Sequence, residues 1–384
     1  MSIEVMTIFE KQLEELAKED LELLIGLQER YDLEFKSSTY ERTESAIKEM
    51  LKDISGMANA YGGHLFLGIS EDDEGRAEKV LGIEDAEEEG QRVMNICLSC
   101  IDPKIPAMKT HSIKVSDKTS VLAIHVPRSH RAPHMVSGKG VNRFFVRHDR
   151  SINHMSVEEI RDSVLKNRYL VEDLKEFLKE RRTEVLERRG RAPMFYLTAT
   201  PPLTLENEIL DASDPRLREL LLSMPPSIEG VSVDRLQGGG LMPTMNGLML
   251  SMRELANFEI FRNGHVEAIY SLEVLELPES GPGKNFLYPH VLANYPVFFV
   301  ELVRRIAEHI GLEEAMSLTV WFFNVGDFYL SSKPRPLRAV HGAPAVSFCV
   351  FEQQIEDFSA PKKLGELIAD RIWNSFGFEK AEKG

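Results

Sequence analysis

The sequence is poor in cysteine, with only Cys97, Cys100 and Cys349 among 384 residues. Three cysteines cannot form the disulfide framework of a small secreted protein, which favours a reducing compartment. Cys97 and Cys100 have the spacing of half a zinc site, but no second Cys-x-x-Cys pair follows to complete it. We therefore expect both thiols to be buried on the apolar face of a helix.

Long hydrophobic runs are also missing. No stretch approaches the roughly 18 apolar residues that a membrane helix needs. The first twenty residues, MSIEVMTIFEKQLEELAKED, lack the basic and then apolar layout of a secretory signal. We expect a cytoplasmic protein with no membrane partner.

Basic residues are outnumbered, 46 against 61 acids, and the net charge is −15. A balance this acidic argues against a protein that coats nucleic acid. One strip is different: residues 128–150 hold six basic residues and a single acid, Asp149. Such a strip can bind phosphate, because a charge is felt over about 10 Å at moderate salt. The candidate nucleic-acid contacts are Arg128, Arg131, Lys139, Arg143 and Arg147, although charge alone equally suits a solvated surface.

Hydrophobic content of 43% and charged content of 28% are typical of globular domains, and the length suggests two of them. Apolar periodicity predicts helices at 5–27, 43–60 and 88–100. Strands are expected at 33–36, 64–69, 108–116, 120–127 and 142–147. Ser156 and Glu159 have the spacing of a capping box, which opens a helix reaching about Arg189. Gly190 and Pro193 then break the pattern, so the domains expected are 1–190 and 191–384.

The second half reads as a separate α+β domain of unknown function, and the whole chain is therefore expected to be α+β. Its strands are expected at 195–198, 248–250, 258–261, 265–270 and 318–323, and its helices at 289–311 and 363–376. Gly- and Pro-rich loops are expected at 237–243 and 278–284.

Candidate chemistry starts at Glu34-Phe35-Lys36. Residues two apart on a strand face the same side, so Glu34 and Lys36 would point together while Phe35 enters the core. Glu29 lies five residues upstream, and Glu71 and Asp72 follow the apolar strand 64–69. Carboxylates suit Mg²⁺ or Mn²⁺, and a lysine beside them can steady phosphate charge. An ion-paired strand and a solvated acidic turn explain the same residues.

Three segments resemble the Schlafen family and its Alba-like domain, over roughly residues 15–170. The first is Glu29 to Lys36, in which a glutamate precedes a Glu-Phe-Lys strand. The second is Met57 to Ile69, where an Ala-Asn turn and paired glycines lead into an apolar strand followed by acids. The third is Phe144 to Arg147, followed by the helix that Ser156 opens.

The resemblance implies a metal-dependent endoribonuclease acting on structured RNA such as tRNA. The resemblance implies that Mg²⁺ or Mn²⁺ would be bound, and catalysis supported, by Glu29, Glu34 and Glu71 or Asp72. Lys36 would contact the scissile phosphate, and Arg143 and Arg147 would position the RNA backbone.

Two departures from the family pattern favour an alternative. Arg30 stands where the family usually has serine, and Glu71 stands where it usually has aspartate, with Asp72 and Asp73 following. The alternative is a non-catalytic regulator that binds nucleic acid or a nucleotide, although the sequence contains no phosphate-binding G-x-x-x-x-G-K-[ST] loop.

Assembly is the last expectation. A single such domain offers a shallow surface, so we expect a homodimer that pairs two of them. The predicted helix at 288–310 is the candidate contact.

Overall fold

The computed structural model describes residues 13–129, 131–138, 140–205, 207–223, 240–252, 256–272, 285–287, 289–312, 314–331, 340–356 and 358–381. The chain forms two compact units, Met1–Glu172 and Asp173–Gly384. The division falls inside helix α5 (Val157–Arg189), and the boundary expected at residue 190 lies at the end of that same helix. Helices and strands mix in both units, so the α+β class is confirmed.

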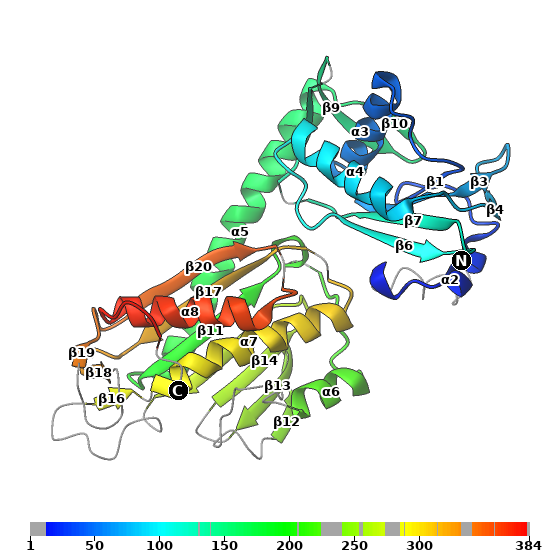
Figure 1. Ribbon diagram of the computed structural model, residues 1–384. Helices are drawn as coiled ribbons and strands as arrows, with labels where there is room; N and C mark the ends of the chain where they lie inside the picture. The colour runs from blue at the N-terminus through cyan, green and yellow to red at the C-terminus, as the bar shows by residue number, and fades with distance from the viewer. Residues whose placement is uncertain are drawn as a thin grey trace. The chain divides into compact units, whose positions relative to one another are not determined.

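A four-stranded mixed sheet organises the first unit (Figure 1). Its order is β1 (Leu33–Lys36), β2 (Gly63–Leu67), β7 (Ser120–Val126) and β6 (Lys109–Lys114). Strand β1 is parallel to β2, whereas the other pairs are antiparallel. Strand β2 is interior, as its apolar composition predicts.

Helices cover both faces of this sheet. Helices α3 (Glu44–Ala58) and α4 (Ala86–Cys100) pack on the face of Leu65 and Leu122, and Thr43 caps α3 by accepting from the Ala46 N–H. The opposite face, with Phe35 and Phe66, is covered by α2 (Lys18–Leu24) and the 3₁₀ turn η1 (Leu13–Glu15). The buried, unpaired thiols of Cys97 and Cys100 on α4 confirm the interpretation of that pair.

The helix expected at 5–27 is wrong in its described part. The chain turns once at η1, and α2 starts only at Lys18. Ala17 is extended, and its N–H donates to the Asp20 carboxylate at 2.8 Å. The bond to the Asp20 side chain thus marks the start of α2, and η1 does not continue into that helix.

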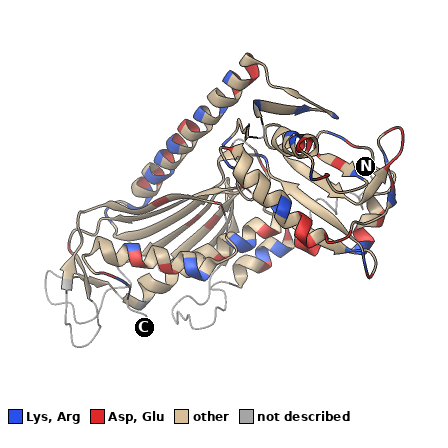
Figure 2. Ribbon diagram, turned by 45° about the horizontal axis from the view of Figure 1, so that its top comes forward, with Lys and Arg blue, Asp and Glu red and all other residues tan. Residues whose placement is uncertain are grey.

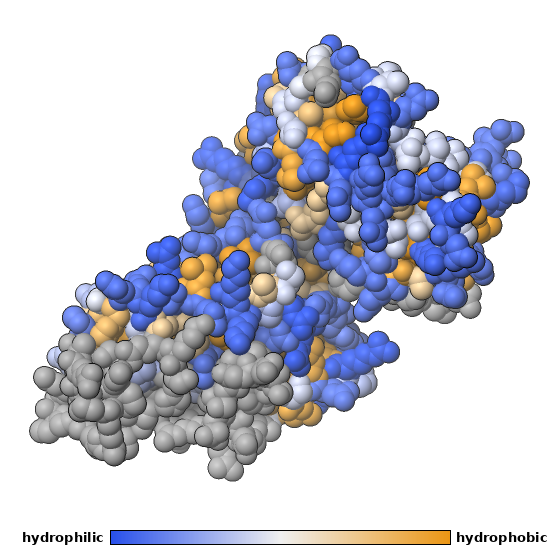
Figure 3. All heavy atoms as spheres, viewed as in Figure 1, coloured by the Kyte–Doolittle hydropathy of each residue, from blue (hydrophilic) through white to orange (hydrophobic). Residues whose placement is uncertain are grey.

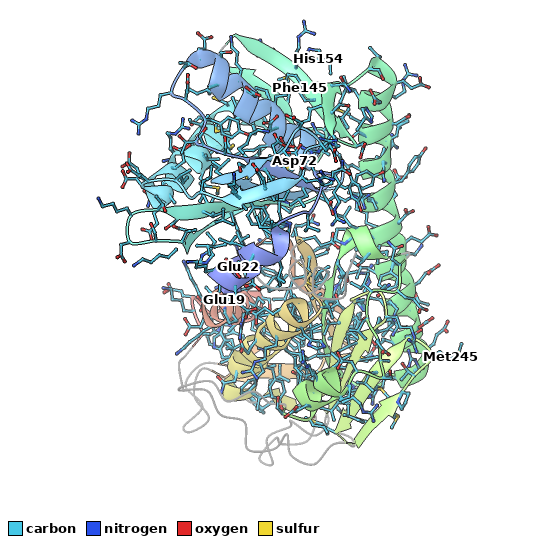
Figure 4. The ribbon with its side chains drawn as sticks, turned by 90° about the vertical axis from the view of Figure 1, so that its right-hand side faces the viewer. Glu19, Glu22, Asp72, Phe145, His154 and Met245 are labelled. Atoms are coloured by element: carbon cyan, nitrogen blue, oxygen red, sulfur yellow. The ribbon has the colours of Figure 1, made fainter. Side chains whose placement is uncertain are left out.

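A second, antiparallel sheet completes the first unit, in the order β10 (Ser151–His154), β9 (Val141–His148), β8 (Met135–Gly138) and β5 (Ile101–Asp102). Phe145 on β9 is buried, and its ring centroid lies 4.8 Å from that of His154 on β10 (Figure 4). The chain after β2 bends at Gly68 into a hairpin of β3 (Ile69–Glu71) and β4 (Ala77–Val80).

Helix α5 begins with the expected capping box. The Glu159 N–H donates to the Ser156 hydroxyl at 3.1 Å, and the Ser156 N–H donates to the Glu159 carboxylate at 2.7 Å. Acidic and basic residues are interspersed along α5 (Figure 2). This composition is typical of a helix with solvated faces.

The second unit is built on a seven-stranded antiparallel sheet. In order, its strands are β12 (Gly240–Pro243), β13 (Gly247–Met252), β14 (Ala256–Phe261), β15 (Val266–Ser271), β11 (Met194–Thr200), β17 (Met316–Phe323) and β20 (Phe348–Ile355). Helices α7 (Pro289–His309) and α8 (Pro361–Ser375) pack against each other and join the large core that the sheet forms. The remaining elements are η2 (Pro202–Thr204), α6 (Pro215–Leu222), β16 (Asn285–Leu287), β18 (Phe328–Ser331) and β19 (Val340–Gly342).

All five strands and both helices expected in this half are confirmed. The loop expected at 237–243 is wrong at its end, because residues 240–243 pair with β13 as strand β12. Residues 237–239 and the expected loop 278–284 lie outside the described residues.

Helix α7 was the candidate dimer contact. Its apolar residues Tyr295, Phe299 and Val303 are buried in the core of their own unit. These three side chains are therefore not available to a second chain, and the contact through this helix stays a prediction. The homodimer itself stays a prediction.

The face of the molecule in Figure 3 is mostly hydrophilic, with hydrophobic side chains gathered in small patches. Among the described residues, none of the helices is long and apolar enough to cross a membrane.

Candidate active site

The candidate site forms where the segment before β1 pairs with the β3–β4 hairpin. The Gly26 N–H donates to the Ala77 carbonyl, and the Ala77 N–H donates to the Leu27 carbonyl, both at 2.8 Å. The Glu29 N–H then donates to the Gly75 carbonyl at 2.8 Å. Backbone pairing therefore brings Glu29 to the hairpin that carries Glu71 and Asp72.

Glu29 is almost buried, with 9% of its surface exposed. Its carboxylate accepts the backbone N–H of Phe35 at 2.9 Å, which places it beside strand β1. The pKa of Glu29 is raised to about 7, first by burial and then by the negative charges of Glu34 and Glu71, against the hydrogen bond from Phe35. The three predicted acids therefore interact electrostatically.

Glu34 and Lys36 point the same way along β1, and Phe35 is fully buried in the core, as the alternation predicts. Lys36 donates to one oxygen of Glu34, and Arg147 donates to the other at 2.5 Å. Burial lowers the pKa of Lys36, but the carboxylates, Glu34 first, outweigh it and raise that pKa overall. Lys36 therefore stays charged beside the acids.

Arg147 was expected to contact an RNA backbone, and the structure gives it a different position. Its side chain has no exposed surface. Besides Glu34, the guanidinium donates to the carbonyls of Arg30 at 2.9 Å, Leu33 at 3.2 Å and Asp149 at 3.0 Å. A guanidinium enclosed in this way cannot reach a ligand, so Arg147 holds Glu34 and the start of β1 in place.

Asp53 is an acid of this region that the sequence reasoning missed. It is 6% exposed, on the buried face of α3, and the Tyr40 hydroxyl donates to it at 2.7 Å. Its pKa is raised to about 6, first by burial and then by the charge of Glu34, against that hydrogen bond. The sequence contains a feature that could have identified it, because Asp53 interrupts the apolar helix face formed by Met50 and Met57.

The two candidates for the third acid differ. Glu71 is exposed at the end of β3, and its charge reaches Glu29. Asp72 instead organises the hairpin turn: it accepts the N–H groups of Glu74 and Arg76, both at 2.9 Å, and the Arg76 guanidinium. These bonds, the backbone bond from Arg76 first, lower the pKa of Asp72. Asp72 therefore has a structural function that Glu71 lacks.

The other basic residues are closer to solvent. Arg131 and Arg143 are exposed, Arg128 is half-buried, and Lys139 lies outside the described residues. Arg150, not among the predicted contacts, has its guanidinium against Gly75, where a Cβ atom would collide with it. It therefore brings positive charge to the hairpin of Glu71.

The donor atoms of these residues indicate whether they suit a divalent cation. The donors are carboxylate oxygens, the ligands that Mg²⁺ and Mn²⁺ prefer. Burial and the neighbouring carboxylates raise the pKa of Glu29, and a bound cation would favour its ionised form. The residue types thus fit a hard cation. Within the part of the chain that the structure describes, no group of three or more His, Cys, Asp or Glu side chains is already placed to hold a metal ion.

Residues 29–156 match the family model described as Schlafen, AlbA_2. The match begins at Glu29 and ends at Ser156, the N-terminal residue of the α5 capping box. The first unit therefore contains a Schlafen AlbA_2 domain, as the resemblance of its three segments implied.

Two solved structures are similar to part of the chain. The DIP2311 protein from Corynebacterium diphtheriae is 22% identical, over 40% of this chain and 26% of its own, with a TM-score of 0.24. The N-terminal domain of a RecG-related protein from Nitrosomonas europaea, described as an ATP-dependent DNA helicase, is 19% identical. That match covers 33% of this chain and 82% of its own, with a TM-score of 0.23. TM-scores this low carry no argument. No curated protein matches the chain.

Proposed function

We propose that the first unit is a metal-dependent endoribonuclease that cleaves the phosphodiester backbone of structured RNA such as tRNA. The observation that carries the proposal is the close set of acids at β1. Glu29 and Glu34 are both nearly buried, and the negative charge of Glu34 contributes to the raised pKa of Glu29. Lys36 and Arg147 already compensate Glu34, whereas the pKa of Glu29 stays raised, and acids with perturbed pKa values are typical of functional sites.

In this proposal Glu29, Glu34 and Glu71 would hold Mg²⁺ or Mn²⁺, with Asp72 as the alternative third acid. When bound, such an ion lowers the pKa of a coordinated water and stabilises charge that develops on phosphate. Lys36 presents its ammonium beside Glu34, where it can contact a phosphate oxygen. Arg147 orients Glu34 from the buried side, since it bonds the second oxygen of that carboxylate.

RNA binding is supported by the Schlafen AlbA_2 domain and by exposed positive side chains of the same unit, of which Arg150 lies against the hairpin of Glu71. Arg131, Arg143 and Arg150 are exposed on the same unit. The whole chain carries −15, so any RNA contact has to be local. We expect the affinity to fall steeply as salt rises.

A non-catalytic RNA-binding regulator is the second candidate. The observation in its favour is that both oxygens of Glu34 already bond cations of the chain, Lys36 and Arg147. Such a protein would bind the same RNA and leave it intact.

Glu71→Gln and Asp73→Asn provide a matched test. Both side chains are exposed neighbours, and each change removes one negative charge. Incubated with total tRNA and Mn²⁺, Glu71→Gln should cleave about a hundredfold more slowly than wild type, because it removes a ligand of the ion. Asp73→Asn should cleave at the wild-type rate, and both should keep the wild-type melting temperature.

Equal cleavage rates for wild type and Glu71→Gln would show that Glu71 is not a ligand of the ion. Binding of tRNA without cleavage by any of the proteins would favour the regulator.

A further inference from the structure

Two exposed tyrosines touch each other beside the acids. Tyr31 is 44% exposed and Tyr61 is 66% exposed, yet their ring centroids lie 5.3 Å apart in an edge-to-face arrangement. Tyr31 lies between Glu29 and Glu34 in the sequence. Large aromatic side chains usually gain stability by burial, so this exposed pair is not explained by core packing.

The turn that carries Tyr31 is held rigidly. The N–H of Arg30 donates to the Leu33 carbonyl at 3.1 Å, and the N–H of Leu33 returns to the Arg30 carbonyl at 3.2 Å. Arg147 donates to both of these carbonyls from the buried side. The same arginine that orients Glu34 therefore fixes the position of Tyr31.

The turn that carries Tyr61 is fixed by Asn59. Its side-chain amide donates to the carbonyls of His134 at 2.9 Å and Phe145 at 2.8 Å, and its oxygen accepts the His134 N–H at 2.6 Å. The Gly62 N–H donates to the Met57 carbonyl at 2.9 Å, which ends α3. Tyr61 thus extends from a short turn bonded on both sides.

Gly63 allows the two turns to meet. Its φ of +144° disfavours other residues, and a Cβ atom there would collide with the backbone of Asp32. The next N–H, of His64, donates to the Asp32 carbonyl at 2.8 Å. The paired glycines therefore bring Tyr61 against Tyr31.

Two arginines lie next to the pair. The Arg30 guanidinium is 5.9 Å from the centroid of the Tyr31 ring, and it also forms an ion pair with Asp32 at 2.5 Å. The backbone of Arg128 touches Gly62, immediately after Tyr61. Aromatic rings beside arginines are what single-stranded nucleic acid requires, because the rings stack on bases while the cations attract the backbone.

We propose that Tyr31 and Tyr61 form a stacking platform for one unpaired base of an RNA strand that passes the acids of β1. The choice of RNA rests on the proposed function, whereas the platform itself is a binding element separate from cleavage. It selects unpaired nucleotides, since a base inside a duplex already stacks on its neighbours. It tolerates any base, because every base has a π face.

The test uses a single-stranded oligoribonucleotide that contains the fluorescent base 2-aminopurine, in buffer without divalent ions. Binding to wild type should quench the fluorescence, and annealing the RNA to its complement should remove most of that effect. Tyr61→Leu should weaken single-strand binding about tenfold, and Tyr61→Phe, which keeps the ring, should bind as wild type does. Tyr169→Leu is the matched control, because Tyr169 is 57% exposed on α5 in the same unit.

Two results would overturn the platform: wild-type affinity in a Tyr61→Leu protein with an unchanged melting temperature, or equal quenching by single-stranded and duplex RNA. Failure of wild type to bind the single strand would overturn it as well. Cleavage is measured separately with Mn²⁺. If Tyr61→Leu loses stacking and none of the proteins cleaves RNA, the nuclease is refuted and the platform is kept. If Tyr61→Leu stacks as wild type does and wild type cleaves RNA, only the platform is refuted.

Discussion

Replacing Arg147 with methionine should destabilise the first unit strongly. The substitution removes a guanidinium with no exposed surface and leaves Glu34, whose side chain is 8% exposed, without its buried partner. Breaking one side of a buried pair typically costs about 3–5 kcal/mol. Lys36 still pairs with Glu34, so we expect the lower end, about 3 kcal/mol.

A loss of this size lowers the melting temperature by about 6–12 °C for a unit of this length. Arg143→Met is the matched control, because Arg143 is on the same strand and exposed. It should change the free energy of unfolding by no more than about 0.5 kcal/mol. Thermal scans at low and high salt should give the same difference for Arg147→Met, since a buried pair is weakly screened.

The double variant Glu34→Gln with Arg147→Met separates the ion pair from packing. If the uncompensated carboxylate causes the loss, removing its charge should recover part of the stability. A single Arg147→Met variant as stable as Arg143→Met would refute the reasoning.

Two further predictions concern pH and assembly. The pKa of Glu29 is about 7 in the folded protein, whereas its ordinary value is 4.5. Between these two pH values the folded state binds more protons than the unfolded state, so the free energy of unfolding falls as pH rises. Glu29→Gln should therefore match wild type near pH 4 and be about 1–3 kcal/mol more stable at pH 8 in urea unfolding; a difference that does not grow with pH would contradict this. The expected homodimer should give a mass by light scattering of twice 43.6 kDa, and the monomer value would refute it.

The sequence predicted the parts of the fold that local patterns determine. The capping box of α5, the amphipathic α3 and the alternation of Glu34, Phe35 and Lys36 are all confirmed. Short strands such as β4 and β8 were missed, because four residues carry too little pattern and tertiary pairing decides their conformation. The break at Ala17 was also missed, although it depends on a local bond from the Ala17 N–H to the Asp20 carboxylate.

The error at Arg147 has a simple geometric origin. Residues 143, 145 and 147 share one face of β9 because side chains alternate along a strand. Phe145 is buried, so Arg147 on the same face is buried too, whereas Arg143 near the strand's beginning is exposed. Charge suggested a phosphate contact, but Arg147 shares its face of the strand with buried Phe145 and pairs with Glu34.

The bond between Arg147 and Glu34 also has a consequence for the order of folding. The two residues are 113 positions apart, and β9 is among the last strands of its unit to be synthesised. A growing chain can form β1 and β2 well before Arg147 exists, but Glu34 then has no buried partner, and the turn of Tyr31 lacks the two bonds that Arg147 donates to it. The carboxylate set and its aromatic neighbour can therefore reach their final geometry only after nearly the whole domain has been translated. A chain truncated before β9 should expose its acids to water and have no ordered site.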